Sequence, residues 1–150
     1  MRGPGTGWVI AQLLLLFLIM LLPKRIDLWP DERLMGILGA LLLAAGAVVI
    51  LLGLGVLRSN FTVFPRPRPE GELVTDGIYG LMRHPFYTGL ILFCLGISFL
   101  TDSLIKLLLT VGLLVFLDAK ARVEERWLEG RFPQYTSYRQ QVKKFIPGIY

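Results

Sequence analysis

The residues best suited to chemistry gather in one short stretch, Gly77–Gly89, whose sequence is GIYGLMRHPFYTG. The stretch combines an imidazole, a guanidinium and two phenols at the start of an apolar run. Pro85 fits the first turn of a helix, where its missing N–H costs nothing. A helix start beside Arg83 and His84 suits an anionic group, because free backbone N–H groups point outward there. The competing interpretation is an interfacial anchor, with these side chains at the headgroup level and no ligand.

A second group of charged side chains lies in the segment KARVEER, which begins at Lys120. Glu124 follows Lys120 by four residues and can pair with it on one helix face, and Arg122 and Glu125 can pair at a spacing of three. Such a charge run after an apolar helix is usually a solvated face. If the helix returns against His84, a carboxylate there could bind a ligand's ammonium or ribose hydroxyls. A basic residue there could bind a carboxylate substrate.

Composition indicates that lipid surrounds the elements that carry these residues. The 150 residues are 54% hydrophobic and 18% charged, and the mean hydropathy is +0.61. A soluble core of this size cannot hide so much apolar surface, so we expect an all-α integral membrane protein with a single domain, 1–150. The net charge of +5 fits contact with anionic lipid headgroups, not nucleic acid, because the basic residues lie between and after the apolar runs. One Cys and one His exclude a zinc-type cluster, so no metal is expected.

Four apolar runs predict four transmembrane helices. The last two runs are short and joined by Thr101-Asp102-Ser103, which predicts a tight hairpin with Asp102 or Ser103 as the helix cap. The first run follows a basic residue, so a secretory signal is its competing interpretation, although no small-residue cleavage site follows it. The second run is rich in Gly and Ala, which predicts close helix packing, within the chain or between chains. The runs are Trp8–Leu22, Leu34–Leu57, Tyr87–Leu100 and Leu104–Leu117.

Polar segments connect and extend these helices. The segment Arg58–Pro85 contains a Pro-Arg-Pro-Arg-Pro stretch, which predicts an extended loop at the headgroup level. Charged residues become frequent from Asp118, so the fourth helix should leave the bilayer and continue to about Arg131. Twelve of the 16 Lys and Arg residues fall on the side shared by the termini and this loop. That bias predicts that both termini, the helical extension and the site are cytoplasmic. Tyr135 and Tyr138 either cover the site or pack at the interface.

Two motifs give the chain a family resemblance. The pattern Gly-x-Tyr-x-x-x-Arg-His-Pro-x-Tyr-x-Gly, from Gly77 to Gly89, resembles the isoprenylcysteine carboxyl methyltransferase family and its bacterial phospholipid-methyltransferase-like relatives. The pattern Glu-Glu-x-x-Leu-x-x-x-Phe, from Glu124 to Phe132, resembles a second family motif. Order and spacing agree over about residues 73–147, which we take as the catalytic region. The chain departs from the family at Phe132–Tyr135, which is one residue shorter than the usual Phe-Gly-x-x-Tyr and has Pro in place of Gly.

The resemblance implies a multi-helix membrane fold that binds S-adenosylmethionine at the cytoplasmic face and takes a lipophilic acceptor from the bilayer. By position, it implies that Lys120 binds the substrate, with Arg122 as the alternative, and that Glu124 binds ligand. Glu124, Glu125 or His84 would act as a base if the acceptor were an amine. The predicted cofactor-binding residues are Leu73, Val74, Tyr79, Arg83, His84, Pro85, Phe86, Tyr87 and Glu124.

The function expected from this resemblance is methyl transfer to a lipophilic acceptor, in the first place a carboxylate of an isoprenylcysteine-like substrate. A carboxylate is ionised at neutral pH, so its methylation needs no general base. The alternatives are a phospholipid or small-amine N-methyltransferase, and a non-catalytic membrane protein that uses the same fold to bind a partner. A membrane reductase is a third possibility, which would need a nicotinamide dinucleotide. The sequence sets neither the acceptor nor the oligomeric state.

Overall fold

The computed structural model describes residues 5–23, 29–57, 62, 64 and 71–150. This part of the chain is all-α, with five α-helices, one 3-10 turn and a single isolated bridge between Met82 and Lys143. The expected all-α class is therefore confirmed, whereas the Pro-Arg-Pro-Arg-Pro stretch at 65–69 lies outside the described residues. The elements are α1 (Thr6–Leu21), α2 (Glu32–Leu57), η2 (Gly77–Gly80), α3 (Pro85–Leu100), α4 (Leu104–Arg131) and α5 (Tyr135–Gln141).

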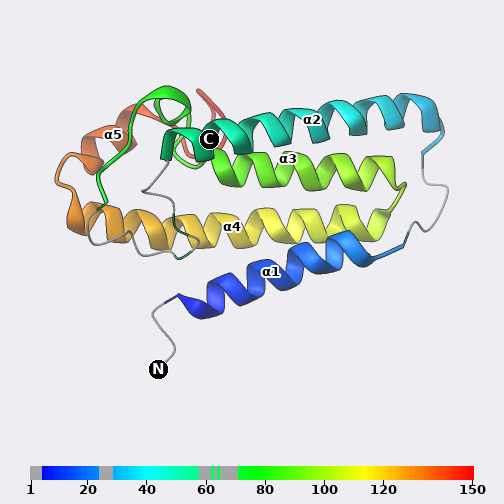
Figure 1. The fold of residues 1–150 in the computed structure, drawn as a ribbon, viewed down its shortest axis with the longest axis horizontal. Helices are drawn as coiled ribbons and strands as arrows, with labels where there is room; N and C mark the ends of the chain where they lie inside the picture. Colours follow the sequence, from blue (N-terminus) through cyan, green and yellow to red (C-terminus); the bar gives the residue numbers. More distant parts are fainter. Residues whose placement is uncertain (1–4, 24–28, 58–61, 63, 65–70) are drawn as a thin grey trace.

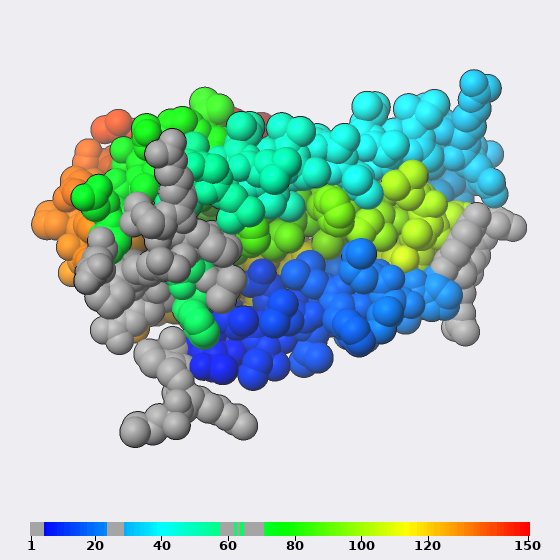
Figure 2. Space-filling model, viewed as in Figure 1, coloured from blue at the N-terminus to red at the C-terminus, as the bar shows by residue number. Residues whose placement is uncertain are grey.

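The first four helices lie side by side and run alternately in opposite directions (Figure 1). Within the described ranges, α2 is the helix long and apolar enough to cross a membrane alone, while α1 and α3 are apolar but shorter. Along most of its length, the face in Figure 2 shows side chains of α1, α2 and α3. Many large apolar side chains of α1 and α2 are exposed, as contact with lipid requires. These features indicate a membrane protein, and the four crossings remain a prediction.

Helices α2 and α3 pack with their backbones in contact. A Cβ atom built on Gly46 would lie 2.5 Å from the backbone nitrogen of Phe93, closer than real Cβ atoms approach other atoms. Neighbouring turns repeat this arrangement, so these glycines give the close packing that their composition predicted, here against α3 of the same chain. The buried glycines are Gly39, Gly46 and Gly53 of α2 and Gly89 and Gly96 of α3.

The turn between α3 and α4 forms the expected hairpin. Ser103 is the N-cap of α4, and its side chain accepts a hydrogen bond from the backbone N–H of Lys106 at 3.4 Å. Asp102, the other predicted cap, instead adopts a positive φ of 47° within the turn. Helix α4 continues to Arg131, as the charged sequence after Asp118 predicted.

The C-terminal segment returns to the start of α3. The backbone N–H groups of Arg83 and His84 donate to the carbonyls of Lys143 and Lys144, at 2.8 and 3.0 Å. The Thr88 hydroxyl donates to the carbonyl of Phe145, the next residue of the segment, at 2.9 Å. Helix α5, which lies before this segment, was not predicted from the sequence. The segment thus fixes the backbone on which the Arg-His pair is mounted.

Replacing Gly46 with Ala should lower the thermal unfolding midpoint of the protein in detergent micelles, followed by tryptophan fluorescence. The added methyl group meets the α3 backbone, and overpacking of this kind costs about 1–3 kcal/mol. The control is Gly55→Ala, because no atom lies within 4 Å of a Cβ at that position of the same helix. Equal midpoints for the two variants would contradict backbone contact between α2 and α3.

Candidate active site

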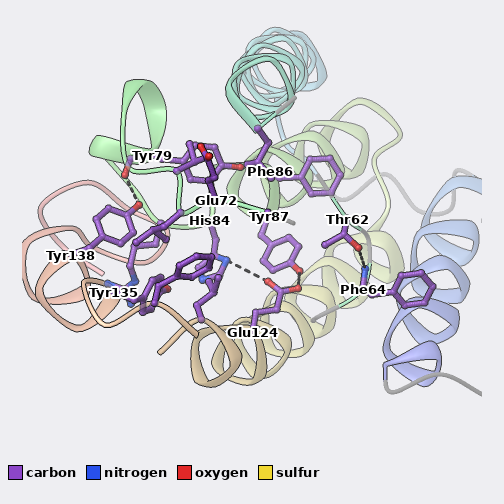
Figure 3. A pocket seen from close by; sticks show the side chains of 17 residues that line it. Thr62, Phe64, Glu72, Tyr79, His84, Phe86, Tyr87, Glu124, Tyr135 and Tyr138 are labelled. Carbon is purple, nitrogen blue, oxygen red and sulfur yellow. Dashed lines mark hydrogen bonds and ion pairs between the residues drawn. The ribbon is translucent and has the colours of Figure 1, made fainter. Parts of the chain in front are cut away.

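A cavity of about 160 Å³ lies at the end of the helices where α2 ends and α3 begins (Figure 3). Leu57 of α2, Tyr79 of η2 and Phe86 of α3 line one part of it, and Glu124 of α4 and Tyr138 of α5 line another. All of these elements except α2 come from the second half of the chain. The cavity therefore forms where the Gly77–Gly89 motif meets the charged half of α4.

The junction before α3 is fixed by its own backbone. Gly77 has a φ of +56°, which favours glycine, and it starts the turn that buries Tyr79. The Tyr138 hydroxyl donates to the Tyr79 carbonyl at 2.5 Å and so ties this turn to α5. Pro85 occupies the first turn of α3, as predicted, and His84 is the N-cap residue. Local geometry thus directs Arg83 and His84 toward α4.

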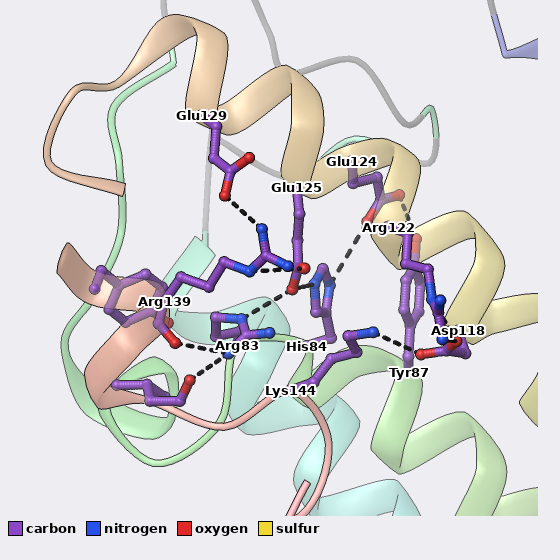
Figure 4. Close-up of polar contacts among 12 residues, drawn as sticks. Arg83, His84, Tyr87, Asp118, Arg122, Glu124, Glu125, Glu129, Arg139 and Lys144 are labelled. Atoms are coloured by element: carbon purple, nitrogen blue, oxygen red, sulfur yellow. Dashed lines mark hydrogen bonds and ion pairs between the residues drawn. The ribbon is translucent and has the colours of Figure 1, made fainter. Parts of the chain in front are cut away.

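Glu125 is the centre of a buried ion cluster (Figure 4). Its residue is 1% exposed, and one carboxylate oxygen lies 2.8 Å from Arg83 Nε and 3.1 Å from His84 Nε2. Its other oxygen lies 3.7 Å from Arg139 Nε of α5. Burial by itself would raise the pKa of Glu125, but hydrogen bonds and charges from His84 and Arg83 prevail and lower that pKa to about 2. This carboxylate is therefore ionised and joins α4 to the junction and to α5.

Glu124 has a different environment, although it is the next residue. Its carboxylate lines the cavity and accepts a hydrogen bond from the Tyr87 hydroxyl (Figure 3). His84 Nδ1 lies 3.6 Å from Glu124 Oε2, so the imidazole stands between the two carboxylates. Burial raises the pKa of Glu124, and the nearby His84, Tyr87 and Lys120 oppose that rise only in part. Glu124 thus presents a carboxylate that gains from a ligand able to donate hydrogen bonds or to supply positive charge.

The cavity wall is mainly aromatic around this carboxylate. The ring of Tyr87 stacks on His84 with 5.4 Å between ring centroids and 3° between ring planes. Tyr135 lines the cavity as well, and its ring meets that of Tyr138 edge-on at 5.7 Å. Aromatic faces beside a carboxylate suit a ligand with a flat ring, hydroxyl groups and a positive charge. Among the described residues, no group of three His, Cys, Asp or Glu side chains is placed to bind a metal ion.

The structure brings together most of the residues predicted to bind the cofactor. Pro85 is the exception, because it packs against α2 near Gly53, 3.5 Å from a Cβ built there. The binding roles of these residues remain predictions. The predicted cofactor residues that line the cavity are Leu73, Val74, Tyr79, Arg83, His84, Phe86, Tyr87 and Glu124.

The predicted catalytic residues separate into different environments. Glu124 lines the cavity, and Glu125 is buried beside it. Lys120 is also buried, with its ammonium 5.3 Å from the centroid of the Tyr87 ring and 4.0 Å from Glu124 Oε1. The predicted pair between Arg122 and Glu125 is wrong: Arg122 contacts Asp118 at 2.7 Å, and its side chain is 64% exposed. Asp118 lies one turn before Arg122 on the same face, whereas Glu125 is buried against Arg83 and His84.

Several cavity residues were missed by the sequence analysis. Leu128 lies one helical turn after Glu124 and therefore on the same helix face, so the spacing could have predicted that it lines the cavity. Glu72 adjoins the predicted Leu73 but has no distinctive spacing. The remaining missed residues lie at the end of α2 or in the loop that follows, where long-range contacts decide their position. They are Leu57, Thr62, Phe64 and Gly71. Phe132, at the C-terminal end of α4, lines the cavity as well and was also missed.

Two curated proteins are similar to about half of this chain. The cobalt-zinc-cadmium resistance protein CzcN of Cupriavidus metallidurans is 34% identical over 83 residues, 55% of this chain and 38% of that protein. The protein-S-isoprenylcysteine O-methyltransferase of Schizosaccharomyces pombe is 38% identical over 79 residues, 51% of this chain and 34% of that protein. The matched segments thus span between a third and two fifths of these relatives.

A solved structure has the same fold. The eukaryotic intramembrane Ras methyltransferase ICMT, an isoprenylcysteine carboxyl methyltransferase, matches with a TM-score of 0.72 at 24% identity. The match covers 96% of this chain and 52% of that one. A family model described as phospholipid methyltransferase matches residues 34–135, from α2 to the start of α5. These matches confirm the resemblance inferred from the two motifs. The chain therefore belongs to the phospholipid methyltransferase family, together with its isoprenylcysteine methyltransferase relatives.

Proposed function

We propose that this protein is an S-adenosylmethionine-dependent methyltransferase that acts on a lipophilic acceptor in the membrane. The observation that carries the proposal is the position of Glu124. This carboxylate faces an aromatic cavity, where the Tyr87 hydroxyl and His84 hold it in place. Membership of the family supports this reaction class, and the cavity would hold the donor.

The cavity residues fit the donor that members of this family use, S-adenosylmethionine. When bound, that cofactor supplies an electrophilic methyl group on a positively charged sulfur. Glu124 would accept hydrogen bonds from ribose hydroxyls or from an ammonium group. The rings of Tyr87 and Tyr79 would contact the cation and exclude water from the reacting atoms. The protein's main contribution is alignment, because methyl displacement needs little covalent help from side chains.

We propose a carboxylate of the isoprenylcysteine type as the acceptor. Lys120 is buried next to Tyr87 and supplies a positive charge close to the cavity. A carboxylate acceptor would be oriented by that charge and would need no proton transfer. A phospholipid or small amine is the second candidate, favoured by the raised pKa of Glu124, which would let this carboxylate accept a proton from an amine.

We also propose an orientation of the protein in the membrane. The beginning of α1, the junction before α3 and the charged half of α4 lie at the same end of the molecule (Figure 1). With four crossing helices, that end faces the cytoplasm, and the cavity opens at the level where a lipid's headgroup and tail meet. A lipophilic acceptor would then reach the cavity without leaving the bilayer.

Purified protein should bind S-adenosylhomocysteine in calorimetry and transfer labelled methyl groups to N-acetyl-S-farnesylcysteine, with phosphatidylethanolamine as the second acceptor. Glu124→Gln should weaken binding about tenfold or more, because an amide replaces the charged acceptor of hydrogen bonds. Glu129→Gln is the matched control, since Glu129 lies on the same helix and pairs with Arg139 outside the cavity lining. If the wild-type protein binds neither S-adenosylhomocysteine nor S-adenosylmethionine, the proposed function is wrong. If Glu124→Gln and Glu129→Gln bind S-adenosylhomocysteine equally well, the role of Glu124 is wrong.

Binding of S-adenosylhomocysteine should weaken as the pH falls. The bound ligand needs an ionised Glu124, and burial raises the pKa of this group above its ordinary value of 4.5. Protonation therefore competes with binding, and the loss begins at a higher pH than for an ordinary carboxyl group. Affinities measured between pH 8 and pH 5 by calorimetry check this, with Glu124→Gln as the variant that lacks the Glu124 contribution. The same pH profile in that variant would contradict the assignment.

The two neighbouring glutamates should differ in their effects on stability. The pKa of Glu125 is about 2 in the folded state and near 4.5 in an ordinary carboxyl, so its ionisation stabilises the fold above pH 4.5. That contribution, about 3 kcal/mol, is lost as the pH falls toward 2. At neutral pH, Glu125→Gln should therefore lower the thermal midpoint.

Glu124→Gln is the comparison for this stability test. Burial raises the pKa of Glu124, so ionisation of this group opposes folding. The neutral amide of Gln should therefore leave the thermal unfolding midpoint unchanged or higher. Both midpoints are measured at pH 7 in the same detergent. A larger loss for Glu124→Gln than for Glu125→Gln would reverse the assignment of these two residues.

A further inference from the structure

Gln12 is the one residue with a polar side chain in the apolar sequence from Trp8 to Leu22. It lies in the middle of α1, and its side-chain oxygen accepts a hydrogen bond from Lys120 Nζ at 2.7 Å. Gln12 does not line the cavity described above. The contact joins α1 to the charged half of α4 across 108 residues of sequence.

Lys120 lies between Gln12 and the carboxylate of Glu124. Its residue is 1% exposed, so its ammonium must be satisfied by neighbouring groups. Gln12 Oε1 is at hydrogen-bond distance, whereas Glu124 Oε1 lies 4.0 Å away and accepts instead from the Tyr87 hydroxyl. The ammonium also lies 5.3 Å from the centre of the Tyr87 ring. A small movement of the lysine side chain would turn the distant charge pair into a contact ion pair.

We propose that Gln12 is a positioning residue, which holds the Lys120 ammonium away from Glu124 and keeps that carboxylate available to the ligand. The inference rests on the proposed function, because it assigns a ligand to Glu124. A contact ion pair would use the lone pairs of Glu124 and offset its charge. The contact with the Gln12 amide instead leaves the ammonium 4.0 Å from Glu124 Oε1. Helix α1 thus sets the charge balance of a site that it does not line.

The test is a double-mutant cycle on the whole protein, with S-adenosylhomocysteine as the calorimetric probe. Gln12→Leu removes the acceptor that lies 2.7 Å from the ammonium and lets the ammonium approach Glu124, so the affinity should fall about fivefold or more. In the Lys120→Met background there is no ammonium to move, and Gln12→Leu should change the affinity less than twofold. A purely structural effect of Gln12 on α1 packing would be the same in both backgrounds and would overturn the proposal.

Two further substitutions separate positioning from folding. Gln12→Glu still offers an oxygen to Lys120 and should keep the affinity for S-adenosylhomocysteine within about twofold of wild type. The Asn side chain is polar but one methylene shorter, so Gln12→Asn should lose affinity as Gln12→Leu does. If the Leu variant does not fold, the Asn variant takes its place in the cycle. Gln141→Leu is the control, because it makes the same chemical change at an exposed residue bonded only weakly to Ser137, at 3.4 Å.

The outcomes distinguish this inference from the proposed function. If wild-type protein fails to bind the probe, the proposed function is wrong and the role of Gln12 falls with it. If wild type binds and Gln12→Leu has no effect, or Gln12→Glu loses as much affinity as Gln12→Asn, the positioning role alone is wrong.

Discussion

The pairing of Glu125 with Arg83 and His84 is the interaction on which the site depends. A buried carboxylate is costly unless cations and hydrogen bonds surround it, so these three side chains must stay together. They come from two motifs 41 or 42 residues apart in the chain. The same carboxylate draws Arg139 of α5 toward it. One buried charge therefore brings the junction, the end of α4 and α5 to a common point, and the cavity is the space left beside it.

Two adjacent glutamates have different environments because consecutive residues of a helix point in different directions. A turn of about 100° per residue lets Glu125 enter the ion cluster while Glu124 faces the aromatic wall. His84 contacts both, with one ring nitrogen toward each carboxylate. The opposite pKa shifts of the two residues follow from these environments. The Glu-Glu dipeptide thus combines a structural anchor with a group that is open to a ligand.

The sequence was informative where local rules apply and silent where distant segments meet. Apolar runs predicted the helices, Ser103 was one of two predicted caps, and the glycines predicted close packing of α2. The family resemblance identified about half of the residues that line the cavity, and their roles remain predictions. Helix α5 was missed because its sequence, YTSYRQQ, has no apolar face, and long-range contacts hold it. The contacts of Lys120 with Gln12 and of Arg122 with Asp118 depend on which way each side chain turns.

The return of the C-terminal segment to the junction before α3 has a consequence for biosynthesis. His84 receives its backbone partner from Lys144, so a ribosome must translate 60 further residues before that bond can form. The α3–α4 hairpin, whose contacts are local, is complete in the nascent chain well before then. The hairpin can therefore form before the pocket, because the backbone support of His84 depends on residue 144. A nascent chain released before residue 144 would retain membrane helices but lack the backbone support of its histidine.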